Sequence, residues 1–180
     1  DIKGVADALL KTIRIYDCDY VRTSDSNAFD EASAFHPGRS AVILKDGKAI
    51  GILGEIHPDV AENYGIEVKV YAAKLNVPEM LKLSEKEVTY KPMPKFPATT
   101  RDLSLICDDN LPAASIEKAI KKAAGKVLEK VTLFDVYKGK QIEEGKKSIS
   151  YSISMRSHDG TLTDEQADSV MKKVLKALKD

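Results

Sequence analysis

The 180-residue chain contains only two cysteines, Cys18 and Cys107. They are too few and too far apart in the sequence for a disulfide framework or a cysteine metal site. We expect both to be reduced thiols, which indicates a cytoplasmic protein. No apolar run approaches the ~20 residues that span a bilayer, and no signal-peptide pattern opens the chain. The sequence therefore predicts no membrane partner and no disulfide-stapled fold.

A phosphate-binding loop is also missing. Gly51 and Gly54 are followed by no Gly-Lys-Ser/Thr motif, and they do not lie between a strand and a helix in a GxGxxG pattern. We expect these glycines to let two strands approach closely instead.

Neither sign of charge is in excess, because 28 Lys and Arg residues balance 28 Asp and Glu residues. The distribution is uneven: residues 1–90 carry 11 basic against 15 acidic residues, and residues 91–180 carry 17 against 13. The second half therefore favours contact with a polyanion. The asymmetry is much weaker than in a free-standing nucleic-acid binder, so any RNA contact should be local, and DNA is not an expected partner.

Residues 1–83 are predicted to form an α+β module of antiparallel strands with helices on one face. Asp1 leads straight into an amphipathic helical stripe from Ile2 to Ile13, with no initiator methionine, which suggests a piece of a longer polypeptide. The other expected elements are strands over 14–22, 41–45, 49–56 and 68–75, a polar loop over 23–33, a turn at Asp46-Gly47, and short helices over 58–64 and 77–83.

Three side chains of this module have chemistry that a site could use. His36, His57 and Glu55 could serve as metal ligands or as an acid–base set, and Glu55 with His57 could serve a hydrolase. Both histidines, however, precede proline at the end of a strand, where capping of a turn is the ordinary outcome. We therefore predict no catalytic residue and no metal site here.

Residues 84–100 form a predicted linker, because Pro92, Pro94 and Pro97 favour an extended, semi-rigid chain. Residues 101–180 follow as a second module. Its expected strands are 102–107, 131–137 and 148–156, with helical stripes over 116–127 and beyond the capping box of Thr163 and Gln166. The order β-α-β-β-α predicts a ferredoxin-like plait that lacks its last strand.

The period of two along each strand assigns side chains to the two faces of this sheet. We expect the following side chains to face the helices: Leu103, Leu105, Cys107, Phe134, Val136, Ile149, Tyr151, Ile153 and Met155. The opposite face should carry Asp102, Ser104, Ile106, Val131, Leu133, Asp135, Tyr137, Ser148, Ser150, Ser152, Ser154 and Arg156. Such a face is equipped to stack and hydrogen-bond unpaired bases, although a merely solvated sheet face remains the alternative.

Several motifs occur together in order and spacing. They are residues 35–41, residues 51–58, Phe96-Pro97, Arg101-Asp102-Leu103-Ser104, Phe134-Asp135-Val136-Tyr137, residues 147–151 and residues 161–164. The set resembles the C-terminal part of the bacterial phenylalanyl-tRNA synthetase β chain. The resemblance implies a class II synthetase-like module without aminoacylation chemistry, followed by a ferredoxin-like anticodon-binding domain. The glycine-and-arginine motif with which class II sites bind ATP is absent.

The resemblance also implies partners and site residues. Asp135, Tyr137 and Ser148 correspond to family positions that contact the anticodon, and Ser104, Ser150 and Arg156 are weaker candidates on the same face. The parent enzyme would be an α₂β₂ assembly that joins phenylalanine to its tRNA with ATP and Mg²⁺ in the α subunit, and no cofactor is expected in this chain. The family closes with a Gly-Ala-x-Leu-Arg strand, which this chain lacks. The alternative function is a ferredoxin-like regulatory module that binds a small ligand.

Overall fold

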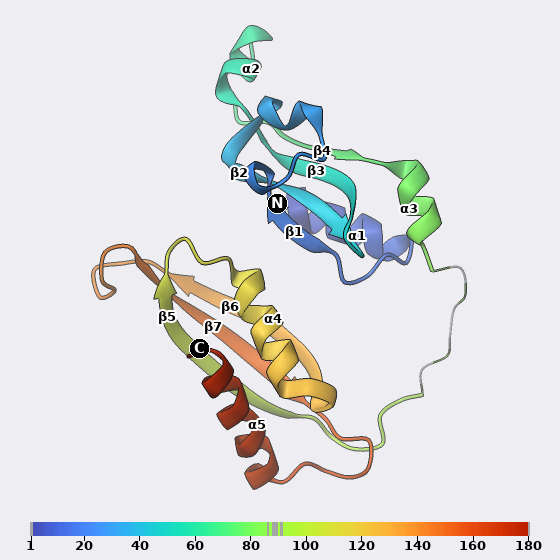
Figure 1. Cartoon of the computed structure of the whole chain (residues 1–180), viewed down its shortest axis with the longest axis vertical. Coiled ribbons are helices and arrows are strands. Elements are labelled where there is room, and N and C mark those ends of the chain that lie inside the picture. Colours follow the sequence, from blue (N-terminus) through green and yellow to red (C-terminus); the bar gives the residue numbers. More distant parts are fainter. Residues whose placement is uncertain (1, 86, 88–89, 91, 180) are drawn as a thin grey trace. The chain divides into compact units, whose positions relative to one another are not determined.

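The computed structural model describes residues 2–85, 87, 90 and 92–179. Contacts divide the chain into two compact units, residues 1–90 and residues 91–180, each with its own antiparallel sheet (Figure 1). The boundary between them lies inside the predicted linker. Among the described residues, no helix is long and apolar enough to cross a membrane.

The first unit has a four-stranded sheet in the order β1-β2-β3-β4. Its elements are α1 (Ile2–Thr12), β1 (Asp19–Arg22), β2 (Phe35–Lys45), β3 (Lys48–Ile56), α2 (Pro58–Asn63), β4 (Tyr71–Leu75) and α3 (Val77–Leu83), with 3-10 turns at Thr23–Asp25 and Asp30–Ala34. Leu10 of α1 and Met80 of α3 pack with Ile43 on one face of the sheet. Phe35 and Val42 form a second cluster on the other face. Helices on one face of an antiparallel sheet confirm the predicted α+β class.

In this unit a turn, a helix and a close strand contact were predicted correctly, and one strand was not. The Asp46-Gly47 turn is confirmed by positive φ angles of 50° and 77°, as is the helix over 77–83. The strand expected over 14–22 was wrong in its first half, because Arg14 (φ 60°) and Asp17 (φ 53°) are left-handed and break an extended chain. The close approach at Gly54 is confirmed, since a Cβ there would lie 2.5 Å from the carbonyl oxygen of Arg39.

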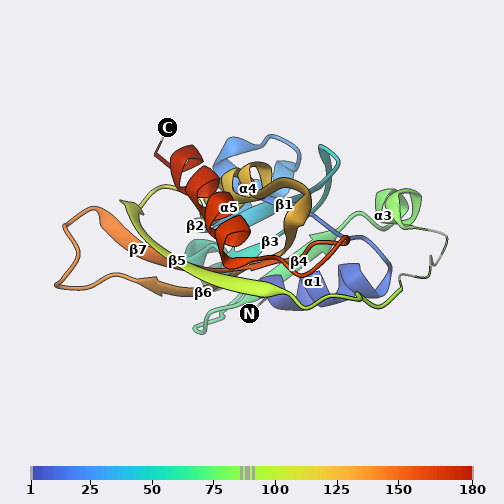
Figure 2. The same cartoon turned by 90° about the horizontal axis from the view of Figure 1, so that it is seen from below.

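The second unit has the elements β5 (Thr99–Asp108), α4 (Ala113–Ala124), a 3-10 turn (Gly125–Val127), β6 (Leu128–Tyr137), β7 (Lys146–Met155) and α5 (Asp164–Ala177). The strand order is β5-β7-β6, and both helices lie on one side of the sheet (Figures 1 and 2). The predicted β-α-β-β-α order is confirmed, and so is the capping box of Thr163 and Gln166 at the start of α5. β5 begins at Thr99, inside the stretch predicted as linker.

A β-bulge in β6 corrects the predicted faces of that strand. Leu133 lies opposite Tyr151, but Asp135 already lies opposite Ser150, so the chain takes two steps on β6 for one on β7. Val131 and Leu133 consequently pack against the core under the helices, where the prediction had them on the open face. Phe134, predicted to be inside, is 55% exposed. Beyond the bulge, Asp135 and Tyr137 have the predicted direction, because Asp135 lies opposite Ser150 and Tyr137 opposite Ser148. Val136, predicted to be inside, lies opposite Ile149 but is 48% exposed.

Candidate nucleic-acid interface

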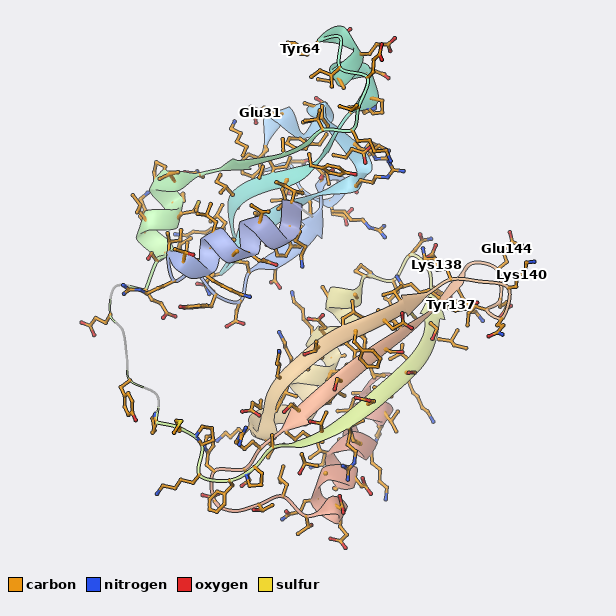
Figure 3. All side chains as sticks on the ribbon, turned by 180° about the vertical axis from the view of Figure 1, so that it is seen from behind. Glu31, Tyr64, Tyr137, Lys138, Lys140 and Glu144 are labelled. Atoms are coloured by element: carbon orange, nitrogen blue, oxygen red, sulfur yellow. The ribbon has the colours of Figure 1, made fainter. Side chains whose placement is uncertain are left out.

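The face of the second sheet opposite α4 and α5 is polar and open. Along β7 every second side chain is buried under the helices, and the intervening residues are serines that point the other way: Ser148, Ser150, Ser152 and Ser154. Figure 3 shows this unit from the side away from the helices, with Tyr137 on β6 in view. Within the described part of the second unit, no helix or further strand covers this face. A ligand could therefore reach this face without displacing any described helix or strand of the second unit.

Strand register brings the three main candidates together. Ser148 on β7 lies opposite Ile106 of β5 on one side and opposite Tyr137 of β6 on the other. In the next row Ser150 lies opposite Asp135. Neighbouring strands are about 4.8 Å apart, so these residues share one small surface. We call Ile106, Asp135, Tyr137, Ser148 and Ser150 the Tyr137 patch.

The candidates differ in how freely they face solvent. Tyr137 is 44% exposed and Asp135 is also exposed, whereas Ser150 is 7% exposed. The hydroxyl of Ser150 lies 2.8 Å from the hydroxyl of Ser104 on β5, so these two serines satisfy each other. Tyr137 and Asp135 are thus better placed to contact a ligand than Ser150, while Ser104 is exposed and Ser148 is half-buried.

Two lysines are fixed at the same end of the sheet. Lys138, next to Tyr137, forms an ion pair with Asp109, and its ammonium group lowers the pKa of that carboxyl below its usual value. The Nζ of Lys147 donates to the carbonyl oxygens of Asp109 at 2.8 Å and Leu111 at 2.7 Å. These contacts tie β6 and β7 to the loop that follows β5.

Arg156 lies at the other end of β7 and is not brought together with the other candidates. It lies eight positions after Ser148, which corresponds to roughly 26 Å along a strand. Its Nε and Nη2 donate to the two carboxylate oxygens of Glu129 at 2.9 and 3.1 Å, and its Nη1 donates to the carbonyl oxygen of Phe96. Its guanidinium group therefore has protein partners, and an RNA contact by Arg156 stays a prediction.

The polar residues of the first unit are used in turns and in one ion pair. The Nδ1 atom of His36 accepts a hydrogen bond from the backbone of Gly38 at 3.1 Å, and that of His57 accepts from the backbone of Asp59 at 3.3 Å. Turn capping by both histidines is confirmed. Both oxygens of Glu55 lie 3.0 Å from Nη1 of Arg39. Burial alone would raise the pKa of Glu55, but the Arg39 guanidinium outweighs it and holds the pKa below its usual value.

A cavity of about 720 Å³ lies beside this ion pair and is lined by His36, Arg39, Glu55 and Lys69, among others. Glu55 is committed to Arg39, and among the described residues no three His, Cys, Asp or Glu side chains gather as metal ligands would. The described donor set therefore does not fit Mg²⁺ with ATP. The hydrolase alternative gains no support either, because Glu55 and His57 are each held by other partners.

The predicted position of Ile106 on the open face is confirmed, since it is 62% exposed and lies opposite Ser148. One contact of the Tyr137 patch was missed by the sequence analysis. Gly139 lies against the tip of the Tyr137 ring, a contact for which the sequence holds no signal.

Comparison with known proteins identifies the family. Residues 1–77 match the family model of the phenylalanyl tRNA synthetase beta chain CLM domain, and residues 94–180 match the ferredoxin-fold anticodon binding domain. The chain is 40% identical over 178 residues to a phenylalanine–tRNA ligase beta subunit of Clostridium acetobutylicum, and 43% identical over 180 residues to that of Clostridium tetani. The Bacillus subtilis beta subunit is 36% identical over 180 residues. These alignments cover 99–100% of this chain but only 21–22% of the relatives. The chain belongs to the family of bacterial phenylalanine–tRNA ligase beta subunits.

Proposed function

We propose that this chain is the tRNA-binding region of a phenylalanine–tRNA ligase beta subunit, and that its second unit recognises the anticodon of phenylalanine tRNA. The observation that carries the proposal is the Tyr137 patch, where register places Tyr137, Asp135 and Ser148 on one open surface. The match of residues 94–180 to a ferredoxin-fold anticodon binding domain supports the same assignment. None of the comparisons supports the small-ligand regulatory module.

Each of the three residues has a distinct task in this proposal. The Tyr137 ring offers a face for stacking, which is worth about 1–3 kcal/mol per base. The Asp135 carboxylate accepts hydrogen bonds from base amino or imino groups, and the Ser148 hydroxyl both donates and accepts. An unpaired anticodon base presents its hydrogen-bonding edge and its ring face together, and the patch matches both.

The first unit is proposed to be a class II synthetase-like module that does not itself catalyse aminoacylation. Its match to the beta-chain CLM domain supports this role, as does the commitment of Glu55, His36 and His57 to contacts within the protein. ATP, Mg²⁺ and phenylalanine would bind in the α subunit of a cytoplasmic α₂β₂ enzyme. Phenylalanine-dependent ATP–pyrophosphate exchange by the 180-residue chain alone would overturn this assignment.

The anticodon proposal is tested by binding of the chain to phenylalanine tRNA and to the same tRNA with a substituted anticodon, over a series of salt concentrations. Binding to both RNAs should weaken with salt along similar slopes, because the phosphate contacts are shared. The difference between the two affinities should persist at every salt concentration, because it comes from stacking and hydrogen bonding to bases. Equal affinity for the two RNAs throughout the series would contradict the proposal.

A further inference from the structure

We propose that Gly139 is a positioning residue, which lets the ring of Tyr137 lie along the sheet with one face open for stacking. The inference rests on the proposed function, because it assigns a role to Gly139 in the same base-binding surface. Gly139 follows Tyr137 by two residues, immediately beyond the end of β6.

Gly139 contacts the far end of the ring. A Cβ atom built on Gly139 would lie 2.5 Å from Cζ and 3.1 Å from Cε1 of Tyr137, and it would overlap the hydroxyl oxygen. Real Cβ atoms essentially never approach other heavy atoms within 3.0 Å. A side chain at position 139 would therefore require the far end of the Tyr137 ring to shift away from its present place.

This contact fixes the direction in which the ring extends. A side chain that stood straight out from the sheet would not reach the residue two positions further on. Because the tip of the Tyr137 ring reaches Gly139, the ring runs along the chain toward the β6–β7 loop. In the proposal, a ring held in this position keeps one face for a base. Its 44% exposure agrees with this arrangement.

The backbone does not require glycine at this position. The glycines with positive φ are Gly47, Gly54, Gly65, Gly125 and Gly145, and Gly139 is not among them. Alanine at 139 is therefore free of the strain that a left-handed conformation would impose. The effect of Gly139→Ala should be confined to the displaced ring.

The test compares variants in the beta subunit that carries this chain, assembled with its α subunit. Gly139→Ala should raise the KM for phenylalanine tRNA, at most to the roughly 5- to 150-fold expected for removal of the ring. The KM for phenylalanine should stay unchanged. Gly160→Ala is the matched control, because Gly160 also lacks a positive φ and a Cβ there would meet nothing within 4 Å.

A double-mutant cycle separates positioning from a general effect on the loop. In a Tyr137→Ala background there is no ring to displace, so adding Gly139→Ala should change the KM for tRNA no further. An equal loss with and without the ring would overturn the proposal, and so would a Gly139→Ala enzyme with the wild-type KM.

The same cycle distinguishes this inference from the proposed function. If Tyr137→Ala leaves the KM for tRNA unchanged, the ring stacks on no base and the Tyr137 patch fails together with Gly139. If Tyr137→Ala raises the KM and Gly139→Ala does not, only the positioning role is refuted.

Discussion

The two faces of the second sheet use the same kind of side chain for opposite purposes. Tyr151 on β7 faces the helices and is 0% exposed, whereas Tyr137 on β6 faces away from them and is 44% exposed. The hydroxyl of Tyr151 donates to the carbonyl oxygen of Ala113 at 3.0 Å, at the start of α4. Tyr137 contacts a glycine at the loop, and its exposed part is open to a ligand. The face of the sheet toward which each strand position points, and not the residue type, decides which tyrosine supports the fold and which could bind RNA.

The surroundings of Tyr151 also keep its phenol protonated. Burial raises the pKa of Tyr151, and the nearby Glu117 carboxylate adds to this effect. The Tyr151 proton is therefore retained throughout the pH range in which the protein is studied, and its hydrogen bond to Ala113 persists. The helix-side tyrosine is a permanent structural donor.

The largest expected effect is on the buried side. Tyr151→Ala should lower the free energy of unfolding by about 3–5 kcal/mol, because it leaves a cavity where α4 and the sheet meet. Tyr151→Phe keeps the ring and should cost only about 0.5–1.5 kcal/mol through the lost hydrogen bond. Denaturant unfolding of the 180-residue chain measures both values. A loss below 1 kcal/mol for Tyr151→Ala would show that the two faces are energetically alike.

The next largest effect is expected at Tyr137 on the open face, and it should change the binding of tRNA. Tyr137→Ala in the assembled enzyme should raise the KM for phenylalanine tRNA about 5- to 150-fold, which corresponds to a loss of 1–3 kcal/mol of stacking. Tyr137→Phe should be much milder, because the ring face remains. The KM for phenylalanine and for ATP should hardly change.

Stability provides the control for this second variant. A partly exposed side chain outside the core should shift the free energy of unfolding by no more than about 0.5 kcal/mol. A Tyr137→Ala protein with a normal KM for tRNA and a large loss of stability would make Tyr137 a core residue. The two faces of the sheet would then not differ in the way proposed, with Tyr151 supporting the fold and Tyr137 binding RNA.

The sequence predicted the face of Tyr137 correctly, but it did so by assuming strict alternation along β6, which a bulge interrupts. The serine alternation along β7 predicted that strand well, because no bulge interrupts its pairing with β5. On β6 the same rule placed Val131 and Leu133 on the face of Tyr137, and the bulge at Phe134 puts them on the other. A bulge leaves little trace in a sequence when the extra residue is an ordinary apolar one. The start of helix α5 was easier to predict from the sequence, because its capping box is a local signal.

The candidate site depends on contacts that only the fold supplies. The sequence placed Asp135, Tyr137 and Ser148 on one face of the sheet, but it did not show which of them are neighbours. The pairing register of β6 and β7 makes Ser148 the direct neighbour of Tyr137. Likewise, the Arg156 guanidinium was expected to be available, and its pairing with Glu129 depends on a strand contact between residues far apart in the chain. Long-range register could not be derived from composition or periodicity.

The smallest expected effect lies at the end of the open face remote from Tyr137. Glu129 accepts from Arg156 and from the hydroxyl of Ser154, at 3.1 Å for the latter, and the Arg156 guanidinium lowers the pKa of Glu129 below its usual value of about 4.5. A lowered pKa in the folded state adds stability that is fully present above pH 4.5 and is lost as the pH falls through the folded-state pKa. Glu129→Gln should therefore unfold slightly more easily than the wild type at neutral pH, and the difference should shrink below pH 4.5 and in high salt. Unfolding curves of both proteins from pH 3 to pH 7 measure it, with the KM for tRNA as the functional control. A stability difference that is independent of pH would assign Glu129 a packing role, and a raised KM would extend the RNA-binding surface to this end of the sheet.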